Sequence, residues 1–376
     1  MRHGWAMAGL GLGGLATVAA IATATVCMTS GCSTLVYYAQ AARGHLALVG
    51  AARPVPEWLA DPATPPPLRQ RLELAQRLRD FATAELGAPE NASYRRYADL
   101  QRPAAVWNIV AAPELSLVAK TWCFAVVGCV AYRGYYAQAD AEREAAALRS
   151  AGLDVSVYPV PAYSTLGRLP GDRFADPLLN TFIDYPEADL AKLVFHELAH
   201  QIAFAPGDTL FNESFATAVE KIGVERWLGG HGSEAARAEH NRTEARREDF
   251  RALTRRYRGL LAEMYASATD DAARRDGKAA LFAAMRADHV ALKATRWNGY
   301  SGYDGWFARA NNATLSVLAA YNDLVPAFVR LFEREGRDFA RFHAEVRRLA
   351  ALPRDERHAA LGAGAGRAND RAATTP

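Results

Sequence analysis

The sequence predicts an α+β fold, with a small mixed sheet in the N-terminal half and a mainly helical C-terminal half. Apolar, strand-like runs lie between residues 104 and 132, and an alternating run follows at 154–167. From Glu187 onward the periodicity is mostly helical, and residues 233–295 are rich in Ala, Arg and Glu. The 376 residues, half of them hydrophobic, are enough for one large domain or two small ones.

The elements follow in order from local signals. A proline-free helical pattern at 34–52 ends at Pro54 and Pro56, and an amphipathic helix covers 68–86. A further helix at 140–152 ends at glycine. We therefore predict these parts: a helical 33–103, a sheet-containing 104–185, two central helices in 186–230, a helical 231–355 and a disordered tail at 356–376.

The N-terminus differs from the rest. Residues 1–31 carry one formal side-chain charge, Arg2, and the stretch from Trp5 to Met28 carries none. This pattern is typical of a secretory signal, and it is also long enough to cross a bilayer as an uncleaved anchor. Ser30 and Gly31 before Cys32 resemble the lipobox of a bacterial lipoprotein, although Thr29 stands where an aliphatic residue is usual.

We expect residues 1–31 to be a signal peptide and Cys32 to carry the lipid, with the uncleaved anchor as the alternative. Both place the remainder outside the cytoplasm. The lipoprotein interpretation places it in the bacterial cell envelope, held to a membrane (the outer membrane is expected) and facing the periplasm. The net charge of +3 is too weak and diffuse to indicate a nucleic-acid partner.

Cys123 and Cys129 bracket a short apolar stretch with Gly128 near its end. A strand–turn–strand path could bring them within disulfide reach, which suits an oxidising compartment. The alternative is two small buried core residues. Metal binding is disfavoured, because no further Cys or His is near.

The stretch HELAH, from His196 to His200, lies in a predicted buried helix at 187–204. The two histidines are four residues apart, about 6 Å along the axis, and so share one face. Both imidazoles can reach one metal ion, and Glu197 can reach a water on it. The donor types favour Zn²⁺. A hydrogen-bonded core cluster without metal is the alternative.

A catalytic zinc needs a third protein ligand. The stretch 205–208 breaks the helix, and another helix follows, which Asn212 could cap. Glu213 would then face back toward the histidines, and we expect it to be the third ligand. Glu220, two turns further, could orient a ligand or be the third ligand itself. Asp208, His231 and His240 are weaker candidates.

The segments HELAHQ (196–201) and NESFA (212–216) resemble the matched motifs of gluzincin metallopeptidases, including the HELAHQ and NEGFA of aminopeptidases. The gap between them is shorter here, and no GAMEN-like segment is evident. Together with the segments around Cys32, Cys123 and Asn311, the pattern resembles a bacterial family described as predicted aminopeptidases, secreted or lipid-anchored. The resemblance covers most of 30–345 and implies a zincin-like catalytic domain across 32–355 with zinc peptidase chemistry.

We therefore expect a peptide substrate, zinc on His196, His200 and Glu213, and Glu197 as general base. Tyr321 is the candidate oxyanion donor, although a core aromatic is the alternative. Residues 158–164 could be an edge strand along which an extended peptide adds. A non-catalytic, zinc-stabilised envelope lipoprotein is the competing function. The sequence leaves exo- or endo-cleavage, substrate sequence and oligomeric state open.

Overall fold

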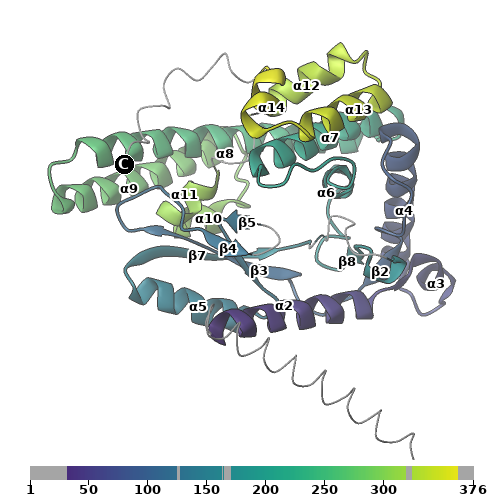
Figure 1. Cartoon of the computed structure of the whole chain (residues 1–376), viewed down its shortest axis with the longest axis horizontal. Helices are drawn as coiled ribbons and strands as arrows, with labels where there is room; N and C mark the ends of the chain where they lie inside the picture. Colours follow the sequence, from purple (N-terminus) through teal and green to yellow (C-terminus); the bar gives the residue numbers. More distant parts are fainter. Residues whose placement is uncertain (1–31, 125–127, 163, 165–170, 319–323, 363–376) are drawn as a thin grey trace, which may run out of the picture. The chain divides into compact units, whose positions relative to one another are not determined.

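The computed structural model describes residues 32–124, 128–162, 164, 171–318 and 324–362 (Figure 1). The chain divides into two compact units, 1–50 and 51–376. The described part of the first unit is residues 32–50, which belong to helix α2 (Cys32–Ala51). The signal-peptide prediction for 1–31 and the candidate Tyr321 lie outside the described residues. Among the helices that are described, none has the length and apolar character needed to cross a bilayer.

The second unit begins with a small mixed sheet in the order β1–β2–β8, in which β1 pairs antiparallel and β8 parallel with β2. Helix α4 packs against α3 and α6, and its end is capped by Gly87 in the left-handed conformation. The elements are β1 (Arg53–Pro54), α3 (Val55–Ala60), α4 (Pro66–Leu86), β2 (Arg96–Ala98), η1 (Asp172–Phe174) and β8 (Leu178–Leu179).

A second sheet has the order β6–β3–β7 and is antiparallel throughout. Helix α5 covers one face and the short helix α11 the other, where Ala313 packs on Val110 and Ala112 (Figure 1). Strand β7 is an edge strand among the described strands, as the sequence predicts. The elements are β3 (Val106–Pro113), β6 (Arg133–Tyr135), α5 (Gln138–Ser150), β7 (Leu153–Val160) and α11 (Asn312–Leu318).

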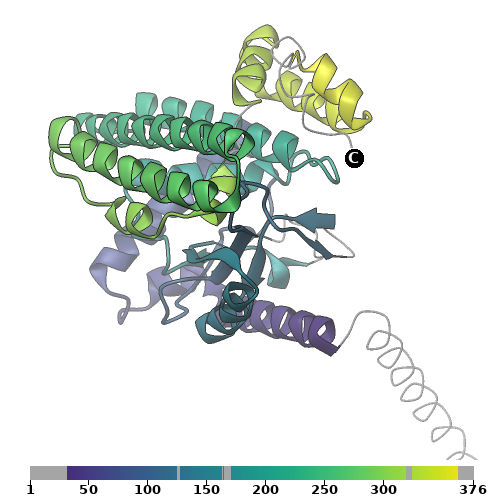
Figure 2. The same cartoon turned by 90° about the vertical axis from the view of Figure 1, so that its left-hand side faces the viewer.

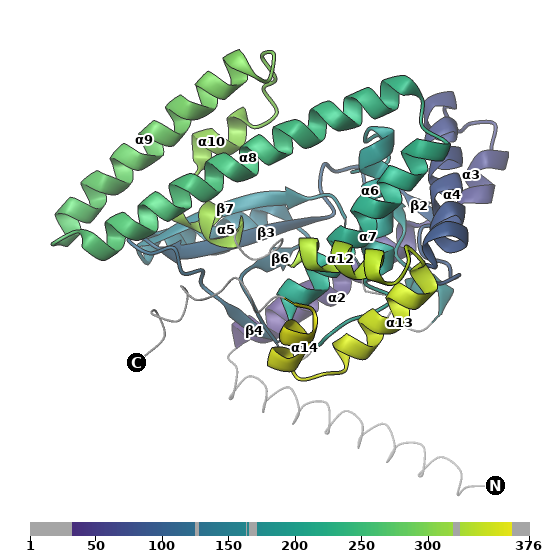
Figure 3. The same ribbon diagram turned by 90° about the horizontal axis from the view of Figure 1, so that it is seen from above.

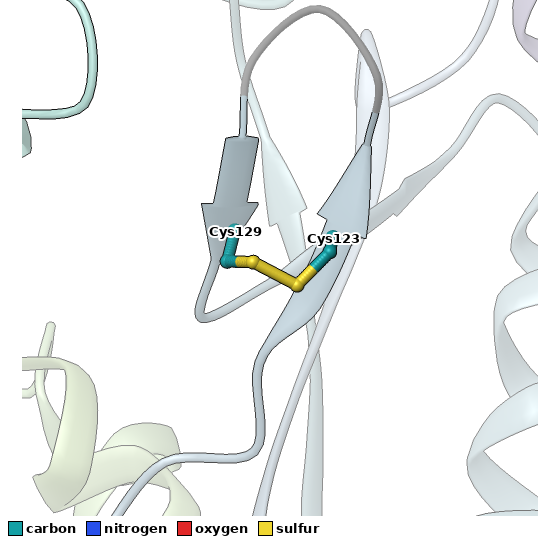
Figure 4. The surroundings of a disulfide bond; sticks show 2 residues. All are labelled: Cys123 and Cys129. Atoms are coloured by element: carbon teal, nitrogen blue, oxygen red, sulfur yellow. A yellow bond between two sulfur atoms is a disulfide. The ribbon is translucent and has the colours of Figure 1, made fainter.

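The predicted disulfide between Cys123 and Cys129 is present (Figure 4). The two cysteines face each other across a two-stranded sheet of β4 (Trp122–Phe124) and β5 (Gly128–Val130). Directly opposite positions in an antiparallel pair bring the Cβ atoms close, which is what the bond requires. The buried-core alternative is wrong, because both cysteines are exposed.

The C-terminal half is helical, as predicted. Helices α6 and α7 pack closely together, and α8 and α9 form a long antiparallel hairpin (Figures 2 and 3). Its own core joins Leu261 and Met285 to Trp297 and Phe307. The helices are α6 (Glu187–Ala199), α7 (Thr209–Gly230), α8 (Glu234–Ser267), α9 (Asp271–Thr295) and α10 (Asp304–Arg309).

Three helices follow and cover α7: α12 (Val325–Arg334), α13 (Phe339–Ala350) and α14 (Arg354–Ala360). Phe328 of α12 contacts Phe211 and Phe215 of α7. The sequence predicts a disordered tail from residue 356, but residues 356–360 belong to helix α14, so this part of the prediction is wrong. Arg357 is buried and Leu361 is 1% exposed, so packing holds this segment in a helix despite its polar composition. Residues 363–376 lie outside the described part.

Candidate metal and catalytic site

Helix α6 carries the two histidines and begins where the sequence indicates. Pro186 is the N-cap residue, and Glu187 and Asp189 lie in the first turn, where the helix dipole favours negative charge. One face is buried, and its Phe195 contacts Phe81 of α4. The helix ends at Ala199 with His200 as C-cap, so the predicted extension to 204 is wrong.

A close approach between α6 and α7 sets the geometry of the site. Gly223 of α7 faces Phe195, and a Cβ atom there would lie 2.8 Å from Phe195 Cδ2 and 2.7 Å from Leu86 Cδ1. Both of those side chains are buried. A glycine at this position therefore lets the two helix backbones approach each other more closely than any larger residue would allow.

The connection between the helices is held by side chains. Asp208 is the N-cap of α7 and accepts a hydrogen bond from the Phe211 N–H. Asn212, predicted as the cap, is instead buried inside the helix, where its amide binds both the N–H and the C=O of Ala205. The prediction failed because Asp208, four residues earlier, already caps the helix.

Three side chains from the two helices meet at one point. His196 Nε2 lies 3.2 Å from His200 Nε2 and 3.3 Å from Glu213 Oε2. His200 Nε2 lies 3.7 Å from Glu213 Oε1. One potential ligand atom from each residue lies within 4.8 Å of the others. The structure thus brings together the three residues that the sequence predicts as ligands.

Glu220 contacts the other nitrogen of the His196 ring, which faces away from His200 and Glu213. Its Oε2 atom is 2.8 Å from His196 Nδ1, and its Oε1 atom is 3.8 Å from Lys192 Nζ. With the Nδ1 proton donated to Glu220, a neutral His196 presents its Nε2 lone pair to His200 and Glu213. Of the two roles considered for Glu220, the geometry matches orientation of a histidine.

The donor set fits a cation. Two imidazole nitrogens and a carboxylate point at one another, and either a metal ion or a proton on His196 can supply the positive charge that this arrangement needs. Burial acts to lower the pKa of His196, but Glu213 and Glu220 outweigh it and raise that pKa well above its usual value. Burial lowers the pKa of His200 to about 4, which favours its neutral, metal-binding form. The His200 Nδ1 atom is buried and has no hydrogen-bond partner among the described residues.

Glu197 lies next to His196 but faces a different environment. Desolvation chiefly raises its pKa to about 7, and the Glu213 and Asp176 carboxylates add to the effect. Ser164 donates a hydrogen bond to Asp176 Oδ2 at 2.9 Å, and its hydroxyl also lies close enough to Glu197 to act against the rise in that pKa. Asp176 is buried and lies between η1 and β8. Part of the surroundings of Glu197 therefore comes from a segment outside α6 and α7.

Tyr94 belongs to the same surroundings. It is 1% exposed and has a φ of 62°, in the left-handed region that non-glycine residues rarely adopt. Its N–H donates to the Asp176 C=O at 2.7 Å. Burial raises the pKa of Tyr94, and the charges of Glu197 and Asp176 raise it further. No sequence pattern marks Tyr94 or Asp176, because both reach Glu197 only through the fold.

A cavity of about 720 Å³ opens on His196 and Glu197. This volume is within the roughly 300–1,000 Å³ range of pockets that hold small ligands. Its walls come from α6, α7, α8 and the loop before α10, and they include residues that sequence reasoning missed. Those residues are Tyr185, Lys192, Glu239, Thr243, Arg246, Arg247, Tyr300 and Tyr303.

The weaker ligand candidates lie elsewhere. The Asp208 side chain is 1% exposed and pairs with Arg357 at 2.6 Å and His358 at 2.8 Å. His231 stacks on Trp227, with ring centroids 4.4 Å apart. His240 lines two other cavities. None of the three joins the metal-ligand cluster found among the described residues.

Fold and site define an α+β protein in which two adjacent helices carry a His–His–Glu cluster of the kind that can hold a metal ion. The chain belongs to the family described as "Putative aminopeptidase", whose model matches residues 36–361. This membership agrees with the resemblance noted in the sequence, and the family description indicates a peptidase. No curated protein and no solved structure matches the chain.

Proposed function

We propose that the protein is a zinc-dependent peptidase in which His196, His200 and Glu213 hold the metal. The observation that carries the proposal is the convergence of these three side chains, with one donor atom of each inside 4.8 Å. Two imidazoles and one carboxylate are a common ligand set of catalytic zinc, which leaves one position open. The bound zinc would supply an activated water and polarise the scissile carbonyl.

Glu197 is the proposed general base. It lines the cavity beside His196, next to the proposed metal site. A base in that place accepts a proton from the attacking water and delivers it to the leaving amine. A site that only stabilised the fold would close with a fourth ligand and would need no such carboxylate. Glu197 therefore disfavours the competing function, a non-catalytic zinc-stabilised lipoprotein.

Tyr321 is retained as the proposed oxyanion donor, on the sequence argument alone. A phenol donates a hydrogen bond to the oxyanion without becoming charged. Tyr321→Phe removes only that donor. We expect it to lower turnover while zinc content and the KM for peptide stay nearly unchanged. A loss of folding in this variant would instead assign Tyr321 to the core.

Strand β7 is the proposed sheet edge to which an extended peptide substrate would add as a further strand. It pairs with β3 along one edge and ends at Val160, so only 158–160 of the predicted 158–164 segment lie in the strand, and Ser164 beyond it is close to Glu197. A peptide that added along the other edge would be directed toward the base. Pro159 has no N–H, which restricts the backbone hydrogen bonds available there.

We also propose that the chain is exported and anchored through a lipid on Cys32, facing the periplasm. The disulfide between Cys123 and Cys129 supports an oxidising compartment, where such bonds persist. Mass spectrometry of the N-terminal peptide from cell envelopes tests this: a diacylglyceryl group on Cys32 supports it. An intact N-terminus at Met1 indicates the uncleaved anchor instead.

The experiment for the whole proposal is metal analysis of the full chain, with Glu213→Ala and the control Glu225→Ala. Glu225 is exposed on the same helix. We expect one zinc per chain in the wild type and the control, and a large loss in Glu213→Ala. A folded wild-type chain that takes up no zinc would mean that a protonated His196 holds the cluster together, and the enzyme proposal would fail.

A further inference from the structure

Arg246 lies in the wall of the cavity that opens on His196 and Glu197. It comes from the middle of α8, and its side chain is 18% exposed. Its nearest described carboxylate is Glu239, at the long distance of 3.9 Å. That carboxylate already binds Arg242 with two contacts of 2.6 and 3.2 Å.

No hydrogen bond to the Arg246 guanidinium is found among the described residues. A guanidinium has five N–H donors in a planar fork that matches a carboxylate. None of the Arg246 nitrogens is among the buried atoms without a partner in the described part of the chain, so they face the open cavity, where a bound anion can take up these charge-assisted hydrogen bonds. Arg246 is therefore placed to accept a negatively charged group.

The other charges in the wall already have partners. Lys192 and Arg247 each bind Glu244 at 2.6 Å, and Arg247 also binds Asp189 at 2.8 Å. Glu220 binds His196. Apart from Glu197, each described carboxylate of the wall is thus held by a basic side chain or a histidine. The wall offers an arginine to a substrate more readily than it offers a carboxylate.

The Arg246 guanidinium lies over the aromatic ring of Tyr300. The guanidinium carbon lies 4.4 Å from the centre of the tyrosine ring, which is a cation–π contact. Consecutive left-handed residues, Asn298 (φ 48°) and Gly299 (φ 77°), turn the chain so that Tyr300 reaches the cavity. Stacking of this kind fixes the plane of the guanidinium and leaves its edge open for two parallel hydrogen bonds.

Gly302 makes room for this tyrosine. A Cβ atom at position 302 would lie 2.2 Å from the Tyr300 hydroxyl and 2.3 Å from its Cζ atom. The tyrosine ring is partly exposed, so it would move away rather than break the fold. Gly302→Ala is therefore a variant that displaces the support of Arg246 without removing any functional group.

We propose that Arg246, held on Tyr300, binds a carboxylate of the peptide substrate and makes the site selective for it. The inference rests on the proposed peptidase function and names the substrate class of that site. The carboxylate is either the free C-terminus of a short peptide or an acidic side chain near the scissile bond. Both sources present the same planar anion to the guanidinium.

The affinity for peptide probes tests the proposal without any need for hydrolysis. The full chain with Glu197→Gln, which cannot turn over peptide in our proposal, is titrated with trialanine, with trialanine amide, and with trialanine amides that carry one Asp or one Asn. We expect a carboxylate-bearing probe to bind about tenfold or more tightly than its neutral match. A gain with trialanine alone identifies the C-terminus; a gain with the Asp amides identifies a side chain.

Substitutions in the protein then test whether this binding preference comes from Arg246. Arg246→Gln should abolish the preference, and Arg246→Lys and Gly302→Ala should each weaken it. Arg255→Gln is the matched control, because Arg255 is exposed on the same helix, pairs with Glu248, and is not part of the cavity wall. A preference that survives Arg246→Gln, or that Arg255→Gln removes equally, would overturn the proposal.

Hydrolysis of the same probes is measured with Glu197 intact. If no probe is hydrolysed, the proposed function fails, while the binding preference still tests Arg246. If neutral and acidic probes are hydrolysed and bound equally, the function stands and the carboxylate site is rejected.

Discussion

The Nδ1 atom of His196 and the Oε2 atom of Glu220 lie 2.8 Å apart, although the residues are 24 positions apart in the chain. This hydrogen bond fixes the His196 ring so that its Nε2 atom faces His200 and Glu213. A carboxylate in this position also makes the imidazole a stronger donor to a metal.

Glu220→Gln should weaken zinc binding by about 10- to 100-fold, because the ring loses the negative charge that orients and polarises it. Competition with a chelating dye measures the affinity. Glu225→Gln, an exposed change on the same helix, should leave it unchanged. Equal zinc affinity in both variants would mean that Glu220 does not orient the ligand.

Glu197→Gln should retain zinc and lose peptide hydrolysis by at least about 100-fold, because the amide cannot accept the proton of the attacking water. The side chain keeps nearly the same size, so the fold and the three metal ligands remain. Parallel zinc analysis and a peptide-hydrolysis assay provide the test. Turnover near the wild-type rate in this variant would remove Glu197 from the mechanism.

Gly223→Ala should destabilise the fold by about 1–3 kcal/mol, because the new methyl group would collide with the buried Phe195 and Leu86. Urea unfolding measures the change. Gly229→Ala on the same helix has nothing within 4 Å of the added Cβ and should be neutral or slightly stabilising. If the two variants have equal stability, the close approach of α6 and α7 is not rigid.

Asp208→Asn should cost about 3 kcal/mol at neutral pH, because it leaves the buried Arg357 without its partner. Burial alone would raise the pKa of Asp208, but hydrogen bonds from Phe211, His358 and Arg357 outweigh it and lower the pKa. A lowered folded-state pKa gives stability that is present above the unfolded value of about 3.9 and is lost as pH falls further.

The difference in unfolding free energy between wild type and Asp208→Asn should therefore be constant above about pH 5 and shrink below it. Asp338→Asn is the control: it changes an exposed N-cap of α13 and should cost much less. A difference that does not depend on pH down to 3 would show that the Asp208 charge contributes nothing.

Much of the site follows from local pattern. The i, i+4 spacing of His196 and His200 places both rings on one helix face, whatever the remaining fold. The connection between Ala199 and Thr209, which includes the predicted break at 205–208, turns the next helix back, so Glu213 near its start faces the histidines. The strand propensity around Cys123 and Cys129 likewise leads to the observed hairpin. These features depend on contacts between residues close in sequence.

Other features could not be predicted from the sequence. The α6–α7 distance depends on one glycine, Gly223, which has no special local signal. The cap of α7 is Asp208 rather than Asn212, because Asn212 is buried against Ala205. The segment around Arg357 has a polar composition but becomes helical because Asp208 and the carbonyls of α13 bind the guanidinium.

The sequence by itself thus determined the α+β class, the two helices and the three candidate metal ligands, since helical periodicity is a property of neighbouring residues. Only the tertiary structure decided that Glu220 supports His196, that Tyr94 and Asp176 surround Glu197, and that Arg246 and Tyr300 form the cavity wall. Those contacts join segments far apart in the chain, and packing of the whole fold sets them rather than any local preference.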